Sequence, residues 1–279
     1  MGNPARNSPG EHLTLVYRGA AAWNHWRQKH GHLRPNLAGC NLGKMDLRGF
    51  DLSHTNLSAA NLQAANLEGV NLNSSLLVGA NLVAAQLTGI EAVAINLRHA
   101  QLAGADLREA NLIGGDLGEA VLSGTDLSRV NLIGCILRYA DLRQAEMAAA
   151  QLQRADLSYA ELEATNLIQA NLTQANLYQA TLIGAYLYGA DLSRANLRSA
   201  RCAQTYMVSA NLEGIQAENA DLSWSNLSKV NFTGANLRGA NLQGTRLHRA
   251  QFNQTCLENA DWDLADWQQA QGFLGSPRY

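Results

Sequence analysis

The chain has 279 residues, of which 47% are hydrophobic and 16% charged, and its formal net charge is −2 at pH 7. This near-neutral balance argues against a protein that binds nucleic acid through a basic surface, and equally against a heavily acidic mimic of DNA. The high apolar content and the low net charge also argue against an intrinsically disordered chain.

An N-terminal segment, residues 1–34, precedes the main body of the chain. Within it, residues 11–30 predict one amphipathic α-helix, because apolar side chains recur at helical spacing. They are Leu13, Val16, Ala20 and Trp23. We expect this helix to cap the first coil of the following domain, since a solenoid must cover its terminal edges. A helix that binds a partner or a membrane surface is the alternative.

The sequence carries few targeting signals. The N-terminus lacks the apolar stretch that a secretory signal contains, and no segment reaches the ~20 apolar residues of a membrane helix. Cys40, Cys135, Cys202 and Cys256 have no CxxC spacing, which indicates free thiols in a reducing compartment. We therefore expect a cytoplasmic protein that makes no contact with a membrane.

Residues 35–270 repeat with a period of five. Leu or a substitute occupies every fifth position, here called the centre, from Leu37 to Trp267. A small residue, most often Ala, lies two positions before the centre, and Asn or Asp often lies one position before it. This period fits neither a helix nor a flat strand. It predicts a chain that turns a corner in every unit, with the centre and the small residue pointing inward.

Positions 20 residues apart share their residue types, which indicates that four units close one coil. The small-residue site that begins at Cys40 holds Ala in nearly every later coil, and Phe232 lies one coil before Phe252. Where Ala92 occupies a centre, Ile90 occupies the paired inward site, which conserves volume. The sequence therefore predicts an all-β solenoid of about 11 to 12 coils, stacked at the ~4.8 Å spacing of strands.

The corners of the coil have their own signals. Gly is frequent two residues after the centre, where it supplies the positive φ of a type II turn. Corners without Gly are expected to adopt another turn type. The Asn or Asp before the centre is expected to accept a hydrogen bond from the main chain two residues further on.

Residues 271–279 form a short C-terminal tail. Trp262 and Trp267 occupy centres just before it, and Phe273 and Leu274 lie inside it. We expect these bulky side chains to close the last coil of the solenoid.

Blocks such as ANLQA, ADLRE, ANLIG and ADLSR resemble the pentapeptide-repeat family, whose repeat is written A(D/N)LXX. The resemblance covers most of the chain and implies a right-handed quadrilateral β-helix. It also favours a cyanobacterial source. Because some relatives associate end to end, it implies either a monomer or a dimer joined through the C-terminal end.

No motif in the chain indicates catalysis. The phosphate-binding loop, the GxGxxG turn, HExxH and GxSxG are all absent from the sequence. His25, His30 and His32 form a local cluster, but their spacing matches no established metal site. We therefore expect no enzyme activity, no catalytic residue, no metal and no cofactor.

Function is expected on the outward side chains, where two sides of the coils stand out. The first candidate is an aromatic and aliphatic patch formed by Ile168, Tyr186, Tyr188, Tyr206 and Val208. The second carries Arg98, Arg138, Arg198 and Arg238, with Tyr139, Tyr159 and Tyr178 nearby. A smaller aliphatic stack comprises Val93, Ile113 and Ile133. Each set favours a docking surface, because aromatic residues and Arg are enriched in interfaces. The alternative is the β-propensity of stacked strands.

These features favour a rigid, non-enzymatic scaffold that binds a protein partner and not nucleic acid. The family resemblance implies that such a scaffold can be regulatory in a cyanobacterium, for instance in heterocyst differentiation. The alternative from the same family is a DNA mimic that protects a topoisomerase. The near-neutral charge and the unbroken register, which leaves no projecting loop, argue against that alternative.

Overall fold

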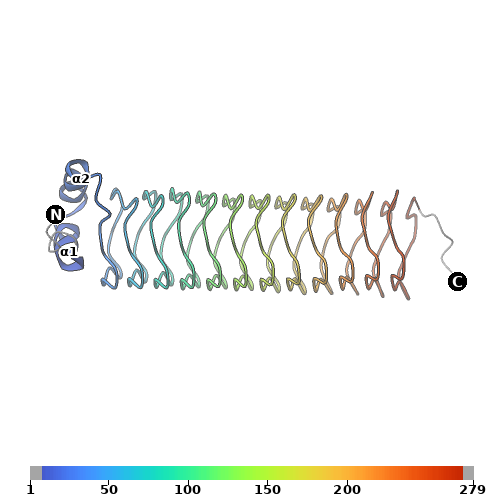
Figure 1. Cartoon of the computed structure of the whole chain (residues 1–279). Coiled ribbons are helices and arrows are strands. Elements are labelled where there is room, and N and C mark those ends of the chain that lie inside the picture. The colour runs from blue at the N-terminus through green and yellow to red at the C-terminus, as the bar shows by residue number, and fades with distance from the viewer. Residues whose placement is uncertain (1–7, 273–279) are drawn as a thin grey trace.

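The computed structural model describes residues 8–272, which form an elongated rod of stacked coils with two short helices at its N-terminal end (Figure 1). Helix α1 spans Pro9–Tyr17 and helix α2 spans Ala20–Lys29. The prediction of one helix over residues 11–30 was therefore wrong. Gly19 separates the two helices, because its φ of 88° is a left-handed value that glycine adopts without a side-chain clash.

The coils stack through isolated parallel bridges between residues 20 apart, from Asn36↔Asn56 to Gln251↔Gln271. Only the residue before each centre forms a bridge, so no longer strand is assigned within residues 8–272. The centre then donates its amide hydrogen to the following coil, as Leu57 N does to Leu76 O at 2.7 Å. Each unit is thus one short side followed by a two-residue turn.

The corners share a positive φ two residues after the centre, whether or not they contain Gly. Gly124 has a φ of 64°, and Ala84 and Ala164 occupy equivalent positions with φ values of 55° and 54°. The expectation that corners without Gly would differ in conformation was therefore wrong in this respect. Backbone hydrogen bonds to both neighbouring coils hold the turn, and they offset the strain of a positive φ at a residue that carries a Cβ.

The polar residue before the centre fixes the corner as predicted. Asn61 Oδ1, for example, accepts a hydrogen bond from Gln63 N at 3.1 Å, and the same bond recurs along the rod. The Asn amides add a second link between coils, since Asn61 Nδ2 donates to Asn41 Oδ1 at 2.9 Å. Each such Asn therefore stabilises its own turn and the stacking of two coils.

The core is a set of ladders inside the rod. Leu centres are buried along its length, and each is worth ~1.5–3 kcal/mol on burial before the loss of conformational entropy is subtracted. The rings of Phe232 and Phe252 stack with their centroids 5.1 Å apart. Ile90 and Ala92 are both buried, as the predicted exchange of volume requires.

The two ends of the rod differ. At the N-terminal end, Val16 and Trp23 are buried, and the ring of Trp23 lies 6.3 Å from that of Phe50 in the first coil. At the C-terminal end, Trp262 and Trp267 are half-buried and pack against the core. The predicted contribution of Phe273 and Leu274 lies outside the described residues.

Candidate protein-binding surface

The tyrosine side is the side of the coils that carries Ile168, Tyr186, Tyr188, Tyr206 and Val208. A parallel bridge joins Tyr186 to Tyr206, and their rings stack with centroids 5.2 Å apart and planes 9° apart. The three tyrosines remain 45%, 52% and 51% exposed, in chain order. The structure therefore brings this set together on successive coils, with about half of each tyrosine open to solvent.

Tyrosine at these corners removes a local hydrogen bond. In the preceding coil, Asn166 Oδ1 accepts from Ile168 N at 3.1 Å. Tyr186 and Tyr206 have no side-chain oxygen in that place, and none accepts from the amides of Tyr188 and Val208 in the described chain. The corners there rely on backbone hydrogen bonds between coils, and the side chains are left free to face outward.

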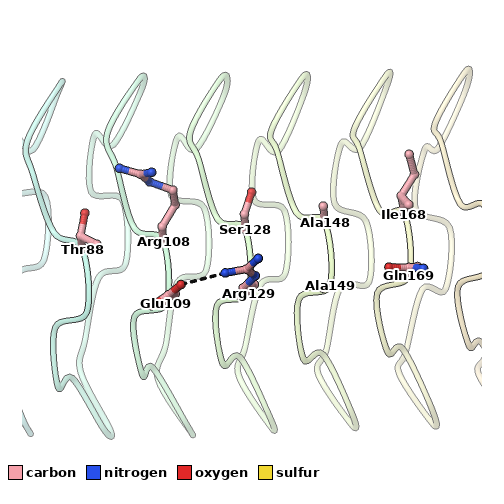
Figure 2. A pocket seen from close by; sticks show the side chains of 9 residues that line it. All are labelled: Thr88, Arg108, Glu109, Ser128, Arg129, Ala148, Ala149, Ile168 and Gln169. Atoms are coloured by element: carbon pink, nitrogen blue, oxygen red, sulfur yellow. Dashed lines mark hydrogen bonds and ion pairs between the residues drawn. The ribbon is translucent and has the colours of Figure 1, made fainter.

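A shallow hollow of about 530 Å³ adjoins the tyrosines on the same side (Figure 2). Ala148 and Ala149 leave its middle open, because each offers only a methyl group. Ile168 and Gln169 form one wall, next to the tyrosines. The apolar surface thus continues beyond the three coils of the patch.

The other wall of the hollow is charged, but its charges are paired. Arg129 Nη1 contacts Glu109 Oε1 at 3.1 Å, as the dashed line in Figure 2 marks. Arg108 Nη2 contacts Asp106 Oδ2 at 2.6 Å, and the hydrogen bond from Arg108 lowers the pKa of the Asp106 carboxyl. Both guanidinium groups are therefore neutralised locally.

The arginine side is the side that carries Arg98, Arg138, Arg198 and Arg238, and each of these has a carboxylate within 4 Å. Arg198 Nη2 contacts Glu218 Oε1 at 2.9 Å. Partial burial raises the pKa of Glu218, but the hydrogen bond and charge of Arg198 outweigh it, and the pKa lies below its usual value. These arginines are committed to contacts between coils.

The tyrosines of the arginine side contact one another. Tyr139 stacks on Tyr159 with centroids 4.8 Å apart, and Tyr159 meets Tyr178 edge-on at 5.6 Å. The guanidinium carbon of Arg138 lies 5.8 Å from the Tyr139 ring centroid. The difference from the tyrosine side lies in the arginines, which are paired with carboxylates, since Tyr139 is itself 53% exposed.

The remaining sequence features contribute little to a site. Val93 and Ile113 are each 37% exposed, so the aliphatic stack is only partly open. His30 stacks against Trp26, with ring centroids 5.0 Å apart. Within residues 8–272, no group of three His, Cys, Asp or Glu side chains is placed to hold a metal ion, and no helix is long and apolar enough to cross a membrane.

Sequence reasoning missed Trp224 and Arg246, which line a second hollow of about 400 Å³ together with Tyr206. Trp224 is 57% exposed and stands at a corner position where Gly or Ala is frequent. That residue choice was the signal available in the sequence. The hollow lies on the tyrosine side, beyond Tyr206, so the patch extends further along the rod than predicted.

This architecture of five-residue units and 20-residue coils agrees with a family comparison. The model named Pentapeptide repeats matches eight times, from residue 36 to residue 261 with residue 92 left out. The chain therefore belongs to the pentapeptide-repeat family, whose members are generally structural or binding proteins without enzyme activity. A comparison with curated proteins gave no match.

Solved structures of the family are similar to this chain. HetL, a pentapeptide-repeat protein of the cyanobacterium Nostoc involved in regulating heterocyst differentiation, is 33% identical over 78% of this chain and 93% of its own, with a TM-score of 0.33. Full-length QnrB1, a plasmid-mediated fluoroquinolone resistance protein, is 16% identical over 75% and 93%, with a TM-score of 0.30. Rfr23 of the cyanobacterium Cyanothece is 31% identical over 39% and 64%, with a TM-score of 0.13.

Proposed function

We propose that this protein is a rigid, non-enzymatic scaffold whose tyrosine side docks a protein partner. The observation that carries the proposal is the exposed stack of Tyr186 on Tyr206, bordered by hollows on both sides. Two stacked tyrosines offer a large contact area at a low cost in rotamer entropy, and their hydroxyls can form hydrogen bonds. The role of the scaffold would be regulatory, as is that of the cyanobacterial relative HetL.

The rod supplies the rigidity that such a surface needs. Every coil is tied to the next by backbone hydrogen bonds, and Asn side chains add links between several neighbouring coils, so the tyrosines are held in place before a partner arrives. Preorganisation of this kind lowers the entropy lost on binding.

The second candidate function is the other role that the family resemblance implies, a DNA mimic that protects a topoisomerase. The charge argues against it, with 23 acidic and 21 basic residues in the chain. Purified gyrase would decide between the two. A scaffold of the proposed kind leaves supercoiling in the presence of a fluoroquinolone unchanged, whereas a DNA mimic restores or inhibits it.

The test of the scaffold is capture of a native partner by the double variant Tyr186→Asn, Tyr206→Asn. Both changes restore the residue type that fixes a corner, so the rod should stay folded. Capture of the partner identified with the native protein should fall at least about tenfold, or ~1.4 kcal/mol. The matched control is Tyr139→Asn, Tyr159→Asn on the arginine side, which should leave capture unchanged. Undiminished capture by the folded Tyr186/Tyr206 variant would rule out the tyrosine side.

Three further features belong to the same proposal. The coil is right-handed and four-sided, with about 11 to 12 coils in the rod; the 20-residue stacking and the five-residue period support four units in each coil. The protein is cytoplasmic and binds neither nucleic acid nor membranes. It is a monomer, or a dimer joined through its C-terminal end, and light scattering on the purified chain distinguishes these states.

A further inference from the structure

A notch interrupts the tyrosine side one coil beyond the stacked rings. Parallel bridges place Tyr206, Asn226 and Arg246 in one column on successive coils. Asn226 is the shortest of the three side chains, so Tyr206 and Arg246 border a gap above it, and all three residues line the hollow of about 400 Å³ described above. Two coil spacings amount to roughly 10 Å, which is room for one side chain of a partner.

Trp224 lines this notch from the neighbouring corner of the coil, and both its backbone conformation and its packing are unusual. Its φ is 60°, a left-handed value rarely adopted by so bulky a residue, and its side chain is 57% exposed. The six-membered part of its indole lies over Gly244, where a Cβ would come within 2.5 Å of Cε3. The absence of a side chain at Gly244 therefore lets the ring lie along the rod and present one face to solvent.

Two of the polar side chains that line the notch, Asn226 and Arg246, offer hydrogen-bond donors. Elsewhere on the rod an Asn amide donates to the residue one coil earlier, as Asn241 Nδ2 does to Asp221 Oδ1 at 3.1 Å. The residue one coil before Asn226 is Tyr206, so Asn226 Nδ2 has no acceptor in the described chain. Its Oδ1 is already used by the amide and hydroxyl of Ser228. The amide hydrogens of Asn226 are left for a ligand.

Arg246 is the cation of the notch, and it has no ion pair within residues 8–272. The arginines of the arginine side each contact a carboxylate, as Arg198 does with Glu218. Asp266 follows Arg246 in the column, but its Oδ1 accepts from Gln268 N and the two charged groups are not paired. Arg246 is exposed, so its guanidinium can bind an incoming carboxylate.

The tyrosine side has no carboxylate over the three coils that border the notch, which carry Tyr206, Asn226 and Arg246, and Asp266 lies on the coil that follows them. Lys229 and Arg249 lie at its corners, and both are exposed. This local excess of positive charge lies on a chain whose net charge is −2, and it would steer an acidic partner to this end of the tyrosine side.

We infer that the notch binds a carboxylate side chain from an acidic segment of the partner protein. This inference rests on the proposed scaffold function and specifies the chemistry of its partner. The carboxylate accepts hydrogen bonds from the guanidinium of Arg246 and from the side-chain amide of Asn226. Apolar neighbours in the segment pack on Tyr206 and on the open face of Trp224, where exclusion of water strengthens the ion pair.

The probe for this site is a phage-displayed library of random 12-residue peptides, selected in parallel on the native full chain and on the variant Arg246→Gln. Peptides selected by the native chain should be enriched in Asp and Glu, and the enrichment should be lost with the variant. An individual selected peptide should bind Arg246→Gln at least about tenfold more weakly in fluorescence anisotropy. Trp224→Ala should weaken it as well, and added salt should weaken binding to the native chain.

The matched control is the variant Arg198→Gln, which removes an arginine that is paired with Glu218. This variant should select the same acidic peptides as the native chain. Selection without acidic enrichment, or equal binding by Arg246→Gln, overturns the inference. Self-association that depends on Arg246, measured by analytical ultracentrifugation, would also overturn it, because the occupant would then be a second copy of this chain. If the inference fails while Tyr186→Asn, Tyr206→Asn still abolishes partner capture, the scaffold function stands.

Discussion

The indole nitrogen of Trp23 donates a hydrogen bond to the carbonyl oxygen of Asp51 at 2.7 Å. In every later coil, that carbonyl accepts from the amide of a centre one coil earlier, as Asn71 O does from Leu52 N. No coil precedes Asp51, so the side chain of Trp23 takes the place of the missing main chain. Arg27 Nη2 does the same for Ser53 O at 2.8 Å. Helix α2 therefore closes this part of the first coil with side-chain donors.

We expect Trp23→Phe to loosen the first coil, because it leaves the half-buried carbonyl oxygen of Asp51 without a hydrogen-bond donor. The free energy of local opening should fall by ~1–3 kcal/mol. Hydrogen exchange of the amides in residues 36–56 measures it, since terminal coils can open locally. Trp26→Phe is the control, because its indole nitrogen has no hydrogen bond among the described contacts, and it should cost less. Equal exchange in the two variants would contradict this role of Trp23.

Protonation of His12 should weaken the cap. Burial lowers the pKa of His12, although hydrogen bonds to Asn36 and Ser8 and the charge of Glu11 oppose the shift. As pH falls below about 6.5, the unfolded chain therefore binds a proton that the folded chain does not, and stability decreases until the folded pKa is passed. Exchange of the first-coil amides, corrected for intrinsic rates, should accelerate over this range.

The pH response has a specific control. His12→Asn keeps an acceptor for Asn36 N and removes the titrating group, so the acceleration should largely disappear. His25→Asn, at an exposed position on helix α2, should retain it. A response that persists in His12→Asn would assign the effect to another group.

Overpacking the Ala column should destabilise the rod. Ala160 is 1% exposed and lies between Ala140 and Ala180, so Ala160→Leu has no space to fill. We expect a loss of roughly 1–3 kcal/mol, measured by thermal unfolding. The exposed change Gln169→Leu should be nearly neutral. If the two variants unfold at the same temperature, the interior has more room than the ladders of buried Ala indicate.

The four cysteines should react with thiol reagents in an order set by burial. Burial raises the pKa of Cys135 and of Cys202 to about 12, and it also raises the pKa of Cys40. Cys256 is free and exposed. Titration of the native protein should therefore modify Cys256 first, and the other three only on unfolding. Early modification of Cys135 would show that the rod opens in its middle.

Much of the fold could be predicted from the sequence, because the conformation of each five-residue unit depends mainly on interactions within that unit and its neighbours. The period of five, the inward columns and the hydrogen bond from Asn or Asp to the next corner all follow from residue types within one or two units. Gly19 carried a visible signal for the break between the two helices, and the prediction of a single helix overlooked it.

The conformation of the corners needed the tertiary structure. A non-Gly residue prefers a negative φ in isolation, but Ala164 and Trp224 adopt positive values because the coils on both sides form hydrogen bonds with their main chain.

Part of the candidate site could likewise be predicted from the sequence, and part could not. The sequence alone determined that Tyr186, Tyr206 and Arg198 face outward, since they occupy outward positions of the repeat.

Only the stacked coils decided which of these groups are free to bind. Arg198 meets Glu218 one coil away, whereas Arg246 meets no carboxylate, and the indole of Trp224 lies over Gly244. Such pairings depend on side chains 20 residues apart and on the space each leaves for the other. The sequence indicates which residues are neighbours on successive coils, but only the tertiary structure decides which of those neighbours pair.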